Sequence, residues 1–194
     1  TFDNPSTSVI AFSAVENLNA GGGNDQFIFQ VGGTLTGFID GGAGSDVADF
    51  SALATVVNAA AVGAGGTDGL DVNVGQVSGG ITNLNALVGG SSLTDSLTGP
   101  NAANTWSYSG TDTFILGSGG GSLSVSSFET IFGGSANDTF VLGTGAVSSS
   151  VNGGGGTDIV SYAGRGTSLS VDLAYGTFPF IPLANSIESV IGGA

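Results

Sequence analysis

Seven aspartates recur along the chain in one short pattern, and their carboxylates are the groups with the clearest capacity for chemistry. The pattern reads Asn, Ser or Thr, then Asp, any residue and an apolar residue, usually with Gly in front. A carboxylate can bind a divalent cation through its oxygens, or it can accept hydrogen bonds from backbone N–H groups in a turn. The seven are Asp25, Asp46, Asp68, Asp95, Asp112, Asp138 and Asp158.

Both roles are open for this row, and the turn role is favoured. Asn, Ser or Thr followed by Asp after a glycine is good turn chemistry. If the turns stack as coils about 4.8 Å apart, however, successive carboxylates come close together. Like charges at that spacing repel by roughly 1 kcal/mol in water, and a bound calcium ion would remove that cost. The seven aspartates are therefore candidate calcium ligands as well as candidate turn formers.

A second pattern places one polar residue at a fixed point between apolar residues. It contains all three glutamates of the chain and one asparagine, and three of its four copies lead directly into the aspartate pattern. A polar side chain at one place per repeat predicts a stacked turn or cap. The four residues are Glu16, Asn85, Glu129 and Glu188.

The steps between successive aspartates are 21, 22, 27, 17, 26 and 20 residues. Internal periods of this length are typical of solenoids, in which a single repeat cannot bury its apolar face alone. Between the turns, apolar residues mostly alternate with polar ones, as in half-buried strands. The prediction is an all-β, right-handed parallel β-solenoid of about eight or nine coils of roughly 22 residues each.

Several finer expectations follow from the same pattern. Residues 52–64 are expected to form a strand, and residues 98–108 and 177–182 are expected to be loops because each contains proline. The second loop should leave the stack or cover an edge. The aromatic residues expected to stack inside the coils are Phe27, Phe29, Phe114, Phe128, Phe132 and Phe140.

Self-similarity predicts one module over residues 1–194, with repeats inside it. Residues 19–27 read like residues 132–140, and residues 40–46 read like residues 152–158. We divide the chain into a lead-in segment (1–14), a first long repeat (15–126) and a partial second repeat (127–194). Without methionine, the sequence is expected to be a piece of a longer repetitive protein.

Composition excludes several classes of function. The net charge is −14, and Arg165 is the only basic residue, so neither nucleic acid nor anionic lipid is an expected partner. The chain has no His, Cys or Lys, which removes the common nucleophile–base pairs, and we expect no enzyme. No apolar run is long enough to insert in a membrane.

Three stretches resemble a known family. Residues 41–49 and 153–161 follow the pattern Gly-Gly-x-Gly-x-Asp-x-apolar-x, and residues 133–141 follow it approximately. This pattern is similar to the haemolysin-type, or RTX, β-roll of large secreted bacterial proteins. The resemblance implies calcium bound between turns, with Asp46, Asp138 and Asp158 as the first ligands and the other four aspartates behind them. Here the pattern occurs once per coil, which looks more like the wide β-helices of adhesins and giant exoproteins.

The expected function is a structural rod- or filament-forming module of a large secreted or cell-surface bacterial protein, an adhesin or matrix component, with calcium as a stabilising ion in one reading. The alternative is a carbohydrate-active or carbohydrate-binding β-helix. The expected partner is a second copy stacked end to end, because residues 187–194 repeat a phrase that elsewhere leads into another coil. A surface or glycan target of the parent protein is a further expectation.

Overall fold

The structure, a computed structural model, describes residues 15–108, 113–172 and 174–193. Over these residues it is all-β, as expected, with 18 short strands and no helix. The strands are β1 (Leu18–Asn19), β2 (Gln26–Ile28), β3 (Ile39–Asp40), β4 (Val47–Asp49), β5 (Asn58–Ala64), β6 (Leu70–Val74), β7 (Val77–Leu84), β8 (Ala86–Val88), β9 (Ser96–Thr98), β10 (Thr105–Tyr108), β11 (Thr113–Ser118), β12 (Gly121–Ser126), β13 (Thr130–Gly134), β14 (Thr139–Leu142), β15 (Ser150–Gly154), β16 (Ile159–Ser161), β17 (Ala184–Asn185) and β18 (Ser189–Ile191).

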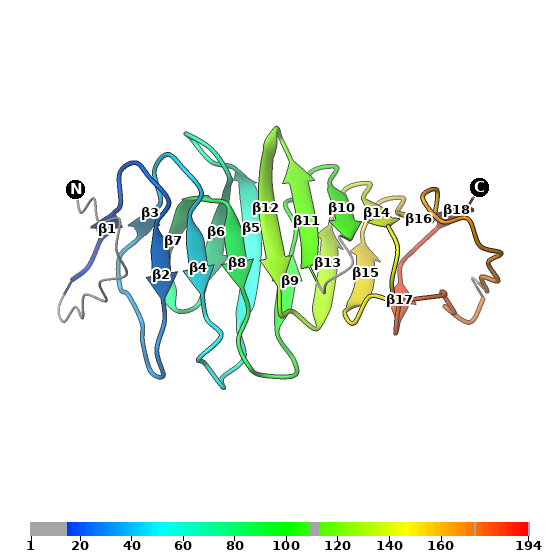
Figure 1. Cartoon of the computed structure of the whole chain (residues 1–194), viewed down its shortest axis with the longest axis horizontal. Helices are drawn as coiled ribbons and strands as arrows, with labels where there is room; N and C mark the ends of the chain where they lie inside the picture. The colour runs from blue at the N-terminus through cyan, green and yellow to red at the C-terminus, as the bar shows by residue number, and fades with distance from the viewer. Residues whose placement is uncertain (1–14, 109–112, 173, 194) are drawn as a thin grey trace.

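The strands form two nine-stranded sheets that run side by side along the molecule. One sheet has the order β1-β3-β7-β6-β5-β9-β13-β15-β17, and the other has the order β18-β16-β14-β10-β11-β12-β8-β4-β2. Figure 1 shows an elongated body in which the strands lie across the long axis, with β1 at one end and β18 toward the other. Neighbouring strands in a sheet mostly come from successive passes of the chain, which is why the repeats of the sequence become rows in space.

The pairing is mixed, which corrects the expectation of a uniform parallel winding. The pairs β5–β6, β6–β7, β10–β11 and β11–β12 are antiparallel, and every other pair is parallel. Two-residue turns at Gly75–Gln76 and Gly119–Gly120 cause two of these reversals, since they join strands with no room for a crossover. Gly119 and Gly120 have φ values of +59° and +92°, the left-handed conformation that a tight hairpin turn needs. The finer prediction of a right-handed parallel β-solenoid stays a prediction.

The core lies between the sheets, and strands such as β10, β12 and β14 contribute every second residue to it. Trp106 and Phe140 are both fully buried and stack with ring centroids 6.1 Å apart. Trp106 lies on β10, so the expected loop at 98–108 is wrong: only residues 99–104 connect strands there. Phe132 is also not a core residue, because it occupies the outward face of β13 between the buried Ile131 and the buried Gly133.

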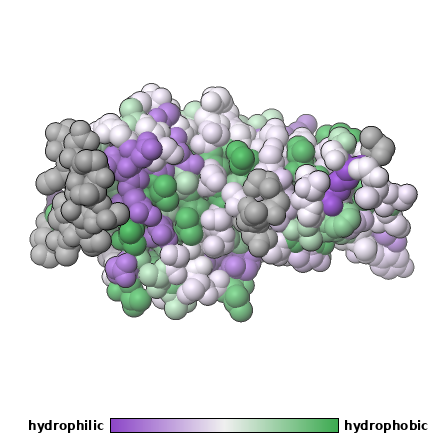
Figure 2. Space-filling view, in the orientation of Figure 1, coloured by the Kyte–Doolittle hydropathy of each residue, from purple (hydrophilic) through white to green (hydrophobic). Residues whose placement is uncertain are grey.

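The remaining fine expectations are met in part. Within residues 52–64 only β5 is a strand, and the residues before it form a turn and a bend. The segment at 177–182 does leave the stack and packs back against it, with Phe178 and Ile181 buried. Figure 2 shows apolar side chains in small separate groups among near-neutral ones on the face in view. Among the described residues, none forms a helix that is long and apolar enough to cross a bilayer.

Candidate functional site

The aspartates of the repeated pattern stand at one structural position, directly before a strand. Five of them do so: Asp25 before β2, Asp46 before β4, Asp95 before β9, Asp138 before β14 and Asp158 before β16. The next residue points outward and the one after it points into the core, as in Val47 and Ala48. The spacing Asp-x-apolar is thus set by strand pleating.

Parallel pairing aligns these positions from strand to strand. At each position the side-chain oxygen accepts a hydrogen bond from the backbone N–H at the same position of the neighbouring strand. Asp46 Oδ1 accepts the N–H of Asp25 at 2.9 Å. Asp158 Oδ1 accepts the N–H of Asp138 at 2.7 Å. The N–H of the residue just before each strand would otherwise lack an acceptor, because the chain turns there. The carboxylate that precedes the neighbouring strand is that acceptor. We call each such bond a staple.

The staples join into three rows, which together we call the aspartate ladder. The first and second residues of each row are linked by the same contact: Asp95 Oδ1 accepts the N–H of Val57 at 2.8 Å, and Asp138 Oδ1 accepts that of Asn104 at 2.8 Å. The rows are Asp25–Asp46–Asn85, Val57–Asp95–Glu129 and Asn104–Asp138–Asp158–Glu188.

The second sequence pattern proves to be part of the same ladder. Asn85 Oδ1 accepts the N–H of Asp46 at 2.9 Å. Glu129 Oε2 and Glu188 Oε2 accept the N–H groups of Asp95 and Asp158, both at 2.7 Å. The expectation of a turn or cap is therefore confirmed for these three residues, but they share the aspartates' position instead of forming a row of their own. Glu16 is exposed and makes no side-chain staple among the described contacts.

The residue before the aspartate adds a second bond in the opposite direction. Asn24 Oδ1 accepts the N–H of Ser45 at 2.9 Å, while the staple from Asp46 runs back to Asp25. Asn137 and Thr157 repeat this contact at 2.8 Å beside the Asp138–Asp158 staple. The two strands are thus clasped by reciprocal side-chain bonds. The same arrangement occurs in both parts of the chain that read alike in sequence.

The second carboxylate oxygen explains a glycine that sequence reasoning missed. Oδ2 of five aspartates (Asp25, Asp46, Asp95, Asp138 and Asp158) is buried without a hydrogen-bond donor among the described residues. For the last four, this oxygen packs on the Cα of the glycine five residues earlier: a Cβ there would lie 2.7, 3.0, 2.4 and 2.3 Å from it at Gly41, Gly90, Gly133 and Gly153. Only a Cα–H fits that gap, and it can make a weak C–H···O contact. The recurring Gly-x-x-x-x-Asp spacing was the available signal.

The ladder aspartates are unusually deep for ionisable groups. Asp46, Asp95, Asp138 and Asp158 are each 1% exposed or less. Burial raises the pKa of Asp46, Asp138 and Asp158, and it takes that of Asp138 to about 6. The staple to a backbone N–H opposes this rise, and neighbouring acids add to it.

Two predicted site residues lie outside the ladder. Asp68 precedes β6 by two residues, and its Oδ2 accepts the N–H of Gly44 at 3.0 Å, so it clasps a turn without stapling a strand. Asp112 falls outside the residues that the structure describes.

The arrangement of these aspartates fits hydrogen bonding to turn backbones better than it fits the coordination of a calcium ion. Calcium takes six to eight oxygen ligands. In four ladder aspartates, Asp46, Asp95, Asp138 and Asp158, Oδ1 accepts a backbone N–H and Oδ2 faces a glycine Cα. Within the described ranges, no three carboxylates converge in a way that could hold a metal ion. The unpartnered Oδ2 atoms of the described aspartates are a feature that a cation could still use.

A shallow hollow of about 600 Å³ lies on the outward face of the first sheet, beneath the β6–β7 turn. Polar but uncharged side chains line it, among them Asn58, Asn73, Ser78, Ser96 and Thr98. Ser96 Oγ donates to Asn58 Oδ1 at 2.7 Å, which fixes one amide at its edge.

No protein-family model matches this chain. A search of curated proteins likewise finds no significant match.

Proposed function

We propose that this chain is a non-catalytic structural module, a β-solenoid with two antiparallel meanders inserted in it, belonging to a large secreted or cell-surface bacterial protein. The observation that carries the proposal is the aspartate ladder. Its polar atoms are turned inward to backbone N–H groups of adjacent strands, which leaves them to hold the stack together and not to meet a substrate.

The expected hydrogen-bond energies support a stabilising role for these buried carboxylates. A hydrogen bond to a charged group contributes roughly 1.5–3 kcal/mol, and leaving a buried N–H unpaired costs a similar amount. If the buried acids of a repetitive chain bond each strand to its neighbour, the stack of coils is expected to be a stiff rod, because each coil is held to the next.

The ends of such a rod offer strand edges to a partner. β1 and β2 are the last strands of the two sheets at one end, and β17 and β18 are the last at the other. An open edge pairs with a further strand, so the proposed partner is a neighbouring module, a second copy stacked end to end being one form of it. This role suits an adhesin or an extracellular matrix or filament protein.

Small-angle scattering and electron microscopy over a range of concentrations test the proposal, together with hydrogen exchange of the edge strands. We expect an elongated particle whose β2 and β18 amides exchange fast until a neighbour covers them. A spherical particle, or single particles whose edge amides are already protected, would contradict a module that joins end to end.

The hollow beneath the β6–β7 turn favours a second candidate function, binding of a neutral carbohydrate. Its lining amides and hydroxyls can exchange hydrogen bonds with sugar hydroxyls, and no acid lines it although the chain carries 15. A glycan array with Asn58→Ala as the variant tests this, with Asn152→Ala on the same sheet outside the hollow as control. Equal glycan binding by both variants, or none by the unaltered chain, would argue against it.

A further inference from the structure

The three residues that end the ladder rows bond differently from the aspartates that continue them. The N–H groups of Asn85, Glu129 and Glu188 donate to the carbonyl oxygens of Asp46, Asp95 and Asp158, at 3.0, 3.0 and 3.1 Å. An aspartate in the ladder instead offers its N–H to a side chain of the following strand. After Asn85 or Glu129, therefore, no N–H is left for another staple, and we call these three residues terminators.

Two of the terminators are followed by a further strand, which shows what can pair after one. Leu123 aligns with Asn85 when β12 pairs with β8, and Ser149 aligns with Glu129 when β15 pairs with β13. Both are uncharged and buried. The strands join through their backbones here: Ser124 N–H donates to the Asn85 carbonyl, and Ser150 N–H to the Glu129 carbonyl, each at 2.8 Å. At the second junction Ser149 Oγ also donates to the Phe128 carbonyl at 2.6 Å.

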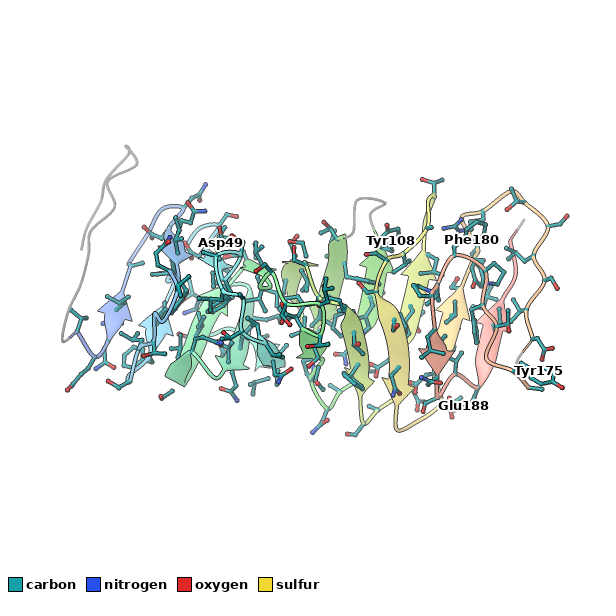
Figure 3. All side chains as sticks on the ribbon, turned by 90° about the horizontal axis from the view of Figure 1, so that it is seen from below. Asp49, Tyr108, Tyr175, Phe180 and Glu188 are labelled. Carbon is teal, nitrogen blue, oxygen red and sulfur yellow. The ribbon has the colours of Figure 1, made fainter. Side chains whose placement is uncertain are left out.

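Glu188 presents the same arrangement at an edge where no further described strand pairs. β18 is the last strand of its sheet, and Figure 3 shows Glu188 toward the C-terminal end of the molecule. Among the described contacts, no backbone N–H donates to the Glu188 carbonyl. A strand arriving here would find a carbonyl acceptor, a carboxylate side chain and no N–H to staple.

The chain's own first coil is a poor match for that edge. If β2 of a second copy paired with β18 in the ladder register, Asp25 would lie opposite Glu188. Each staple inside the molecule offsets the burial of a carboxylate with an N–H, but the Glu188 N–H is already bonded to Asp158. Asp25 would gain like-charge repulsion and no donor.

We propose that the outer edge of β18 pairs with an extended strand that carries an uncharged, core-type side chain opposite Glu188. The edge discriminates against a second copy of the Asp25 coil. This inference rests on the proposed function, and it narrows the neighbouring module to one whose first strand resembles β12 or β15.

Three synthetic peptides test the inference on the full chain. They carry the sequence of residues 120–129 with Leu123 unchanged, with L123N or with L123D, and binding is read by fluorescence anisotropy and by exchange protection of the β18 amides. We expect the Leu peptide to protect β18, the Asn peptide to bind more weakly, and the Asp peptide to bind at least about fivefold more weakly than Leu, the factor that ~1 kcal/mol of repulsion gives.

The variant Glu188→Gln separates charge from shape. Asn85 shows that a neutral amide can make the staple, so this variant should fold and should shrink the difference between the Asn and Asp peptides. Glu129→Gln is the matched control, since β15 already covers that terminator. This variant should leave the difference in binding between the Asn and Asp peptides unchanged.

The outcomes distinguish failure of the inference about β18 from failure of the proposed structural function. Equal or tighter binding of the Asp peptide at β18 overturns the inference and leaves the proposed function standing. The same holds if the unaltered chain pairs head to tail with itself through β2 and β18. If no peptide protects β18 and its amides are already slow to exchange, the edge is closed, and the proposed joining of modules at this end fails as well.

Discussion

At the scale of single residues, the acids of the ladder stabilise the fold by accepting hydrogen bonds from backbone N–H groups of neighbouring strands. Asp138→Ala removes the acceptor for the buried Asn104 N–H, so we expect a loss of roughly 1–3 kcal/mol in the free energy of unfolding. Asp138→Asn keeps an acceptor, as Asn85 does in its row, and should cost less. Urea unfolding measures both. Asp172→Ala, which removes an exposed cap within its own turn, is the control, and an equal loss there would argue against the ladder.

The same residue predicts how stability depends on pH. The pKa of Asp138 is about 6 in the folded chain and 3.8 as its reference value, so between these values the folded state holds more protons than the unfolded state. Stability therefore falls as pH rises through this window, by on the order of 3 kcal/mol in total for this group. Unfolding at pH 5 and pH 7.5 should show the chain more stable at pH 5. Asp138→Asn should reduce the difference, with the part due to Asp46 and Asp158 remaining, and an unchanged slope would refute the assignment.

The glycine five residues before each ladder aspartate gives a sharp steric prediction. In Gly153→Ala the new Cβ would lie 2.3 Å from Asp158 Oδ2 and 2.1 Å from the Ser186 carbonyl, so we expect a loss of about 2 kcal/mol or more. Gly155→Ala is the control in the same turn, since its Cβ would meet nothing closer than 3.7 Å. Thermal melts of the two variants should separate clearly. Similar melting temperatures would show that the Asp158 pocket can relax.

At the scale of elements, the single cation fastens a loop. The Arg165 side chain donates to the Gly145 carbonyl and lies over the Phe180 ring, with Cζ 3.9 Å from its centroid. The same loop is held where Val147 N–H donates to the Phe180 carbonyl at 2.7 Å. The contact thus ties together two loops that leave the sheets.

Replacing this cation should loosen the loop and spare the sheets. In Arg165→Met we expect faster hydrogen exchange at Val147 and in residues 176–183, because both the hydrogen bond and the cation–π contact are lost. Exchange in β14 and β16 should stay as it is. Arg165→Lys, which keeps the charge, should lie in between. Uniformly faster exchange over the whole chain would mean that Arg165 supports the core and not only the loop.

At the scale of the whole molecule, the unpartnered carboxylate oxygens keep the calcium reading testable. Five buried Oδ2 atoms have no hydrogen donor among the described residues, and a cation bound only by the folded state would raise the melting temperature. If calcium stabilises the rod, millimolar calcium should raise the melting temperature above that in EGTA, and magnesium should do so less. Superposable curves in calcium and EGTA would leave the staples as the whole role of the row.

The sequence alone determined the all-β class, the recurring turns and which residues precede the strands. These are local properties: glycine freedom, Asx turn chemistry and period-two alternation act within a few residues. They were enough to mark the seven aspartates of the row, and Asn85, Glu129 and Glu188, as turn positions. Ranking Asp46, Asp138 and Asp158 first among them came from the RTX resemblance. The hairpin at Gly119–Gly120 was also within reach, because two glycines between alternating runs favour a reversal.

Only the tertiary structure decided what those residues bond to. The staple from Asp46 to Asp25 spans 21 residues and that from Asp138 to Asn104 spans 34, so the partner depends on which strands become neighbours and in what register. The meanders set that register, since they place β8 beside β12 and β9 beside β5. A pattern with a period of roughly 20 residues cannot encode such insertions, because each staple goes to the next pass of the chain in the sheet. That pass is the next repeat in sequence for Asp25 and Asp46 but not for Asn104 and Asp138.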